Sequence, residues 1–115
     1  MKSGDTKIIK AKVVLTAWDK TLETRDFGHL SVFLSDDFQF EDTTGEIGDL
    51  ANTESWCVAG EIRISNFKTL REHDNYIVAT HDVEQDGKPH SNVMVYAEQR
   101  NGKFTYWKIQ RAFEV

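Results

Sequence analysis

The C-terminal half of the chain limits the possible folds more than any other feature. It divides into four segments with the character of β-strands, over residues 61–72, 76–86, 90–100 and 103–114. Asp86-Gly87 and Asn101-Gly102 separate two pairs of these segments, and both dipeptides are typical of tight β-hairpin turns. The segments are about twice as long as an average strand. Because long antiparallel strands twist, we expect a curled meander.

The N-terminal half predicts three helices. Apolar residues in its first part recur every three or four positions, which is the helical period and predicts a helix over residues 6–24. They are Ile8, Ala11, Leu15, Trp18 and Leu22. Asp26 is a suitable N-cap for a short second helix, after which residues 35–37 lead into a strand. Asn52 or Thr53 can cap a third helix, which Gly60 would end.

A short strand lies between the second and third helices and ends in a polar turn. Alternation along this strand places Phe38, Phe40 and Asp42 on one face. Two aromatic rings indicate that this is the core face. Helices followed by strands predict an α+β fold, here a cone-shaped, curled, mostly antiparallel sheet with three N-terminal helices. The open end of such a cone is where a ligand would bind.

Size and charge exclude several classes of function. The 115 residues predict one domain over residues 1–115, with a flexible leader at residues 1–6. The net charge of −5 and the lack of a basic stripe argue against nucleic acid as a partner. No apolar run approaches membrane-spanning length, and the N-terminus lacks a signal peptide. With a single cysteine, Cys57, the chain fits the reducing cytoplasm.

Two segments of the chain resemble a known family. Residues 33–45, FLSDDFQFEDTTG, are similar to the stretch of ketosteroid isomerases in which a helix ends in two aspartates, a strand follows, and Glu-Asp-Pro closes it before a glycine turn. Residues 101–104, NGKF, resemble the start of the final family strand. From residue 8 to residue 113 the chain resembles the nuclear transport factor 2-like superfamily, of cystatin-like fold, and within it the SnoaL-like and ketosteroid-isomerase-like proteins.

The resemblance implies a role for Asp42, which matches the aspartate that serves as general base in ketosteroid isomerases. Those enzymes also use a tyrosine and a protonated aspartic acid as an oxyanion hole. The tyrosine position falls on Trp18, Thr43 replaces the family's proline, and the third meander strand offers no acid. The base is therefore matched and the oxyanion hole is not. The superfamily commonly dimerises through its outer sheet face, which implies a homodimer here.

The candidate catalytic residues are Asp42 and His81, and each has an alternative interpretation. Asp42 is either a base whose pKa an apolar pocket raises, or a residue that caps its own turn. His81 shares a face with Ile77, Ala79 and Val83, and inside the cone it would be an acid–base partner for Asp42. If the opposite face points inward, Asp82 takes that place.

The candidate ligand-binding residues are aromatic or lie on the strand over residues 90–100. They are Trp18, Phe38, Phe40, Trp56, Asn92, Met94, Tyr96 and Trp107. The other face of that strand, with Val93 and Val95, could equally be the inner one. Trp107 shares a face with Ile109, Arg111 and Phe113, which forms either the cone lining or the dimer interface.

Two function classes follow from the sequence. One is a cofactor-free isomerase or dehydratase that acts on a small apolar or cyclic carbonyl-like substrate, with Asp42 as general base. The other is a non-catalytic ligand-binding or dimerising module. We expect Cys57 to be a buried, inert thiol, and the spacing of the histidines does not favour a metal site.

Overall fold

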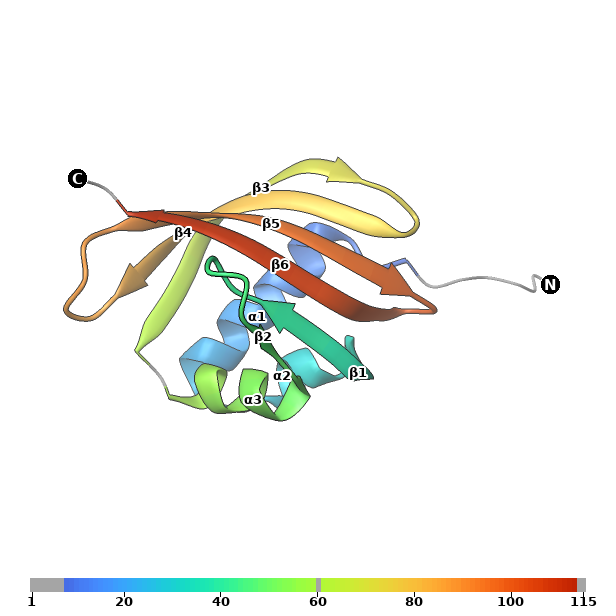
Figure 1. Cartoon of the computed structure of the whole chain (residues 1–115), viewed down its shortest axis with the longest axis horizontal. Coiled ribbons are helices and arrows are strands. Elements are labelled where there is room, and N and C mark those ends of the chain that lie inside the picture. Colours follow the sequence, from blue (N-terminus) through green and yellow to red (C-terminus); the bar gives the residue numbers. More distant parts are fainter. Residues whose placement is uncertain (1–7, 60, 114–115) are drawn as a thin grey trace.

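The computed structural model describes residues 8–59 and 61–113, which form three helices and a six-stranded sheet (Figure 1). The predicted leader and the predicted helix stop at Gly60 lie outside the described residues. The elements are α1 (Ala11–Thr24), α2 (Gly28–Ser31), β1 (Leu34–Glu41), β2 (Ile47–Gly48), α3 (Leu50–Val58), β3 (Ile62–Glu72), β4 (Tyr76–Gln85), β5 (Ser91–Arg100) and β6 (Lys103–Phe113). Their order confirms the predicted α+β class.

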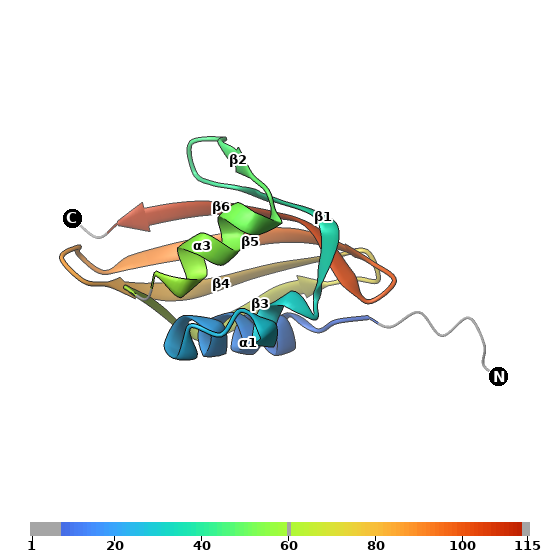
Figure 2. The same cartoon turned by 90° about the horizontal axis from the view of Figure 1, so that it is seen from below.

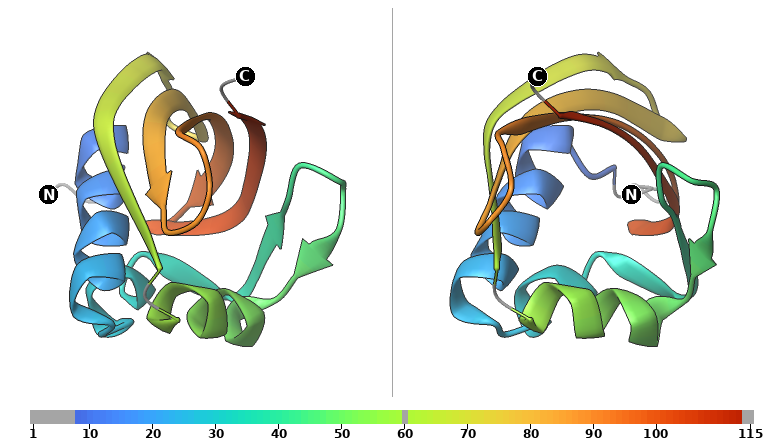
Figure 3. Two further views of the ribbon diagram at one scale, coloured as in Figure 1. Left: turned by 90° about the vertical axis from the view of Figure 1, so that its left-hand side faces the viewer. Right: turned by 60° about the vertical axis from the view of Figure 1, so that its left-hand side comes forward.

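The sheet is mixed, and its strands follow the order β2-β1-β6-β5-β4-β3. Among the described strands, β1 and β6 pair in parallel and the other neighbours are antiparallel. The four predicted meander strands are confirmed with ends shifted by at most a residue. The sheet curls around α1, and the helices lie on its inner face (Figures 2 and 3).

Residues with positive φ shape the turns and the curl. Asn101 and Gly102 have φ values of 55° and 77°, which a two-residue hairpin loop of type I′ requires. Asn66, with a φ of 55°, lies where the register of β3 against β4 shifts between Ser65 and Lys68. Such a bulge bends its strand and increases the local twist, so β3 can wrap over α1.

Helix α1 begins at Ala11, five residues later than predicted. The reason is a tertiary contact: the Gln99 side chain on β5 accepts from the Ile9 N–H at 2.8 Å and donates to the Ile9 carbonyl at 2.9 Å. These bonds engage the N–H and the carbonyl of Ile9, which an additional helical turn would need for its own hydrogen bonds. Lys10 has an extended backbone, and the helix begins after it.

The other two helices also differ from the prediction in their ends. Asp26 accepts from the Gly28 N–H at 2.9 Å, but α2 spans only four residues, and residues 35–37 belong to β1. The N-cap of α3 is Asp49, not Asn52 or Thr53. Asp49 and Asn52 form a reciprocal capping box, with bonds of 2.9 and 3.0 Å.

The core lies between α1 and the inner face of the sheet. Strand β5 shows the sidedness most clearly, because its residues alternate between buried and exposed along the whole strand. Those that face the core are Ser91, Val93, Val95, Ala97 and Gln99. Within the described residues, no helix has the length and apolar character that crossing a membrane requires.

Candidate functional site

A cavity of about 380 Å³ opens between α1, α3 and the inner face of the sheet. Most of its lining is apolar. The polar side chains that reach it are Asp42, Glu46, Thr53, Cys57, His81 and Arg111. A concave apolar space with a few convergent polar groups is the usual form of a small-molecule site.

Four aromatic residues build one wall of this cavity, and all four are among the predicted ligand-binding residues: Trp18, Phe40, Trp56 and Trp107. The ring centroids of Trp18 and Trp107 lie 4.6 Å apart, and those of Phe40 and Trp56 lie 5.3 Å apart. Trp56 is half exposed and packs against β2. Gly48 makes this possible, because a Cβ there would lie 2.8 Å from the Trp56 ring.

The other predicted ligand-binding residues lie elsewhere. Phe38 is fully buried in the core and does not reach the cavity. Asn92, Met94 and Tyr96 are exposed on the outer face of the sheet, so the prediction that they line the cavity is wrong. The opposite face of β5 is buried in the core instead, and Val93 is its contribution to the cavity.

His81 points into the cavity, on the face with Ile77, Ala79 and Val83, so the alternative with Asp82 inside is wrong. Its Nδ1 lies 3.2 Å from the backbone carbonyl oxygen of Asp82. A carbonyl can only accept, so Nδ1 carries the proton in the neutral ring and Nε2 keeps its lone pair. Burial, assisted by the charge of Arg111, lowers the pKa of His81. The ring is therefore a neutral base at pH 7.

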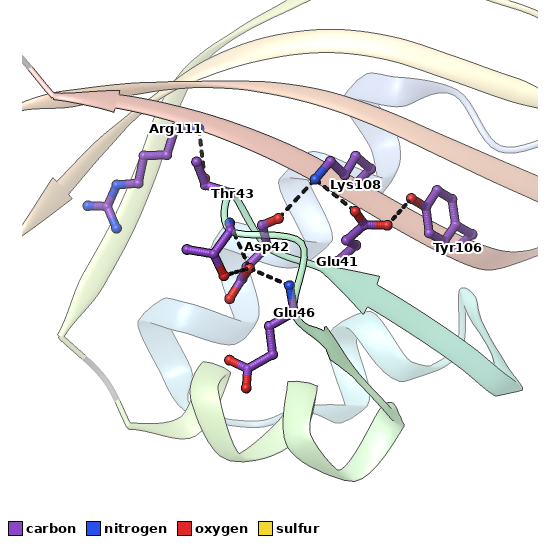
Figure 4. Close-up of polar contacts among 8 residues, drawn as sticks. Glu41, Asp42, Thr43, Glu46, Tyr106, Lys108 and Arg111 are labelled. Carbon is purple, nitrogen blue, oxygen red and sulfur yellow. Dashed lines mark hydrogen bonds and ion pairs between the residues drawn. The ribbon is translucent and has the colours of Figure 1, made fainter.

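Asp42 lines the cavity at its rim and also caps its own turn. One carboxylate oxygen, Oδ1, accepts from the Thr44 N–H at 2.9 Å, the Thr44 hydroxyl at 2.6 Å and the Glu46 N–H at 3.0 Å (Figure 4). The bond from the Thr44 hydroxyl is the largest cause of a pKa below the usual range for an aspartate. The expectation of a raised pKa is wrong, because these donors stabilise the charged form.

The turn that holds Asp42 is fastened to β6 by contacts that the sequence did not reveal. Lys108 donates to the Asp42 carbonyl and to the Glu41 carboxylate, both at 3.0 Å. The Tyr106 hydroxyl donates to Glu41 at 2.6 Å, which raises the pKa of Tyr106 to about 12. The backbone N–H of Arg111 donates to the Thr43 hydroxyl at 3.0 Å. Figure 4 shows these contacts joining the turn to β6.

Arg111 is a site residue that the sequence analysis did not select, although the alternation along its strand placed it on the same face as Trp107 and Ile109. All three line the cavity. Arg111 lies directly across from Val93, which in turn lies across from His81, so the three form one row over β6, β5 and β4. Its guanidinium donates to the Ser91 hydroxyl at 2.8 Å and to the Gln85 amide oxygen at 2.9 Å.

The remaining reactive groups are inert or dispersed. Cys57 is buried, and burial raises its pKa to about 12, so the thiol stays protonated. Among the described residues, no three or more His, Cys, Asp or Glu side chains are grouped so that they could hold a metal ion.

No family model and no curated protein sequence matches the chain. Solved structures do match it. An NTF2-like protein from Anabaena variabilis has a TM-score of 0.76 and 17% sequence identity, over 99% of this chain and 96% of that one. A Kribbella flavida protein provisionally named a ketosteroid isomerase has a TM-score of 0.70 and 13% identity, over 89% and 77% of the two chains.

A third match is an LEH-like epoxide hydrolase from M. tuberculosis, with a TM-score of 0.60 and 18% identity, over 86% of this chain and 80% of that one. At such identities the similarity is one of fold. It agrees with the curled, unclosed sheet over three helices and with the resemblance carried by residues 33–45 and 101–104. The chain therefore has the nuclear transport factor 2-like fold.

Proposed function

We propose that this protein binds a small, largely apolar ligand in the cavity and catalyses cofactor-free proton transfer on it, as an isomerase or a dehydratase does. The observation that carries the proposal is the neutral imidazole of His81 inside a mostly apolar cavity. A base with a pKa near the working pH is the most effective for proton abstraction next to a carbonyl group.

His81 and Asp42 would have different roles in this chemistry. The free Nε2 of His81 would take the proton from the substrate. Asp42, with its lowered pKa, is a weaker base but keeps its negative charge at the rim. The described lining contains no tyrosine, and Trp18 brings the indole N–H donor at the place where the family's tyrosine is expected.

The structural neighbours support an acid–base role without specifying it. One is provisionally named a ketosteroid isomerase, and another is an LEH-like epoxide hydrolase. Because the fold hosts many functions, only the residues of this chain's own site can indicate which reaction it catalyses.

The test uses a small cyclic ketone. Conversion of cyclohex-3-enone to the conjugated cyclohex-2-enone is followed by ultraviolet absorbance. We expect the parent to accelerate it, and His81→Gln to lose about 10²- to 10⁴-fold of that acceleration. His73→Gln, an exposed histidine outside the cavity, is the matched control. An unchanged rate in His81→Gln together with a large loss in Asp42→Asn would return the role of base to Asp42.

The second candidate is a non-catalytic ligand-binding module. It is favoured by the use of Asp42 as a turn cap, which accounts for this residue without any reaction. The same experiment separates the two candidates. Ligands that raise the melting temperature of the parent without being converted would support the binding module and contradict the enzyme.

We also propose that the outer sheet face forms a homodimer interface. Met94 and Tyr96 are exposed there, and the rings of Tyr76, Tyr96 and Tyr106 form a row with centroid distances of 6.0 and 6.3 Å. Met94→Lys should weaken self-association in sedimentation experiments. Val13→Lys, an equally exposed apolar position on α1, should not.

A further inference from the structure

Within the part of the chain that the structure describes, no carboxylate compensates the positive charge of the Arg111 guanidinium at the cavity. Its two bonded partners, the Ser91 hydroxyl and the Gln85 amide oxygen, are both neutral. Among residues 8–59 and 61–113, no carboxylate forms an ion pair with it. An arginine cannot shed its proton in a protein. A partly buried charge without a counter-ion costs stability, so its position at a cavity points to a partner beyond the described residues, and a bound ligand can be that partner.

The carboxylates nearest to this cavity do not serve as that counter-ion. Hydrogen-bond donors of its own turn stabilise the charge of Asp42. Figure 4 shows the Arg111 side chain extending away from Asp42 and Glu46. Burial is the only cause that shifts the pKa of Arg111, and it lowers it, whereas a nearby carboxylate would raise it. The positive charge is therefore available to a ligand.

The side chain is also held in a fixed orientation. Nε and one Nη are tied to Ser91 and Gln85, and the Phe113 ring lies against the guanidinium at 4.5 Å from its centroid. The remaining N–H groups have no hydrogen-bond partner among the described residues, and they can donate in the planar geometry that matches a carboxylate. Such preorganisation lowers the entropy that binding must overcome.

We infer that the cavity takes a small amphipathic carboxylic acid, whose carboxylate binds Arg111 and whose apolar ring lies against the tryptophans. This inference rests on the proposed function and adds the substrate class to it. The row of His81, Val93 and Arg111 sets the spacing: two strand intervals, about 10 Å between the outer Cα atoms, separate the anion anchor from the base. A cyclic acid bound at Arg111 would place ring carbons beneath His81.

The probes are cyclohexanecarboxylate and its neutral isostere cyclohexanecarboxamide. All three tryptophans of the chain line the cavity, so intrinsic fluorescence reports its occupancy, and neither probe absorbs in that range. We expect the parent to bind the carboxylate about 10- to 100-fold more tightly than the amide. Arg111→Gln should bind both equally. Arg100→Gln, which removes the same charge from the outer face, should keep the full preference.

Arg111→Lys keeps the charge and loses the planar guanidinium, so the preference for the carboxylate over the amide should fall severalfold. If Arg111→Gln does not fold, the result for Arg111→Lys is the test of the inference. Equal binding of the two probes to the parent, a preference that survives in Arg111→Gln, or an undiminished preference in Arg111→Lys would overturn the inference. Failure of both probes to bind would overturn it as well. His81→Gln separates it from the proposed function: this variant should lose turnover of the neutral ketone and retain the preference for the carboxylate.

Discussion

The contact between Gln99 and Ile9 should be one of the most costly single hydrogen-bonded contacts to remove. Gln99 is 5% exposed and Ile9 is 7% exposed. The Gln99 amide satisfies both the N–H and the carbonyl of Ile9. Gln99→Leu preserves the size of the side chain but leaves two buried backbone groups without partners, and the start of α1 loses its attachment to β5.

The magnitude follows from these two groups. An unsatisfied buried polar group costs about 1–3 kcal/mol, so the pair costs about 2–6 kcal/mol. The leucine side chain recovers about 1 kcal/mol through its apolar surface. Because the segment before Ala11 can also detach and become hydrated, we expect a net loss of about 2–4 kcal/mol. For a domain of this size that is a fall of about 8–16 °C in melting temperature.

The assay is urea unfolding followed by tryptophan fluorescence and circular dichroism. Gln110→Leu is the matched control, because it makes the same substitution at an exposed position on β6. We expect it to change stability by no more than about 0.5 kcal/mol. If Gln99→Leu were no more destabilising than Gln110→Leu, the reasoning about buried backbone groups at Ile9 would be refuted.

Three further predictions concern the site. Asp42→Asn should lower the melting temperature, because the charge accepts three donors in its turn; a rise would mean that the carboxylate is strained. His81 binds a proton less tightly in the folded protein than in the unfolded chain, so the free energy of unfolding should fall as the pH drops below about 6.5. Urea midpoints at pH 7 and pH 5 should show a smaller loss in His81→Gln, and equal losses would contradict the lowered pKa. Cys57 should react with a thiol reagent at pH 8 only after unfolding, and rapid labelling of the native protein would disprove its burial.

Local patterns in the sequence were enough to predict the elements. The hairpin dipeptides and the period of two fixed the four meander strands, and the helical period identified α1. The ends of the helices were less predictable. Asp49 rather than Asn52 caps α3, where the two residues form a reciprocal capping box. Several neighbouring polar residues could have taken the place of the cap, and only side-chain geometry distinguishes them. The start of α1 depends on Gln99, some 90 positions away.

Part of the site was also visible in the sequence. Alternation placed His81 with three apolar residues, and the family resemblance located Asp42 at a strand end. Trp18, Phe40, Trp56 and Trp107 line the cavity because aromatic residues on core faces border the space that a curled sheet leaves open. Arg111 was not selected, since a lone arginine at the end of a strand is usually solvated.

The sequence by itself determined which residues share a face, and only the tertiary structure decided which face points inward. A period of two is unchanged when a strand is turned over, so β5, with apolar residues on both faces, left the choice open. Packing in the core settled it: Val93, Val95 and Ala97 are buried there, and Met94 and Tyr96 lie on the surface. The same step placed Arg111 beside the cavity, across one strand from His81, because register between strands distant in the chain is set by their pairing and not by local pattern.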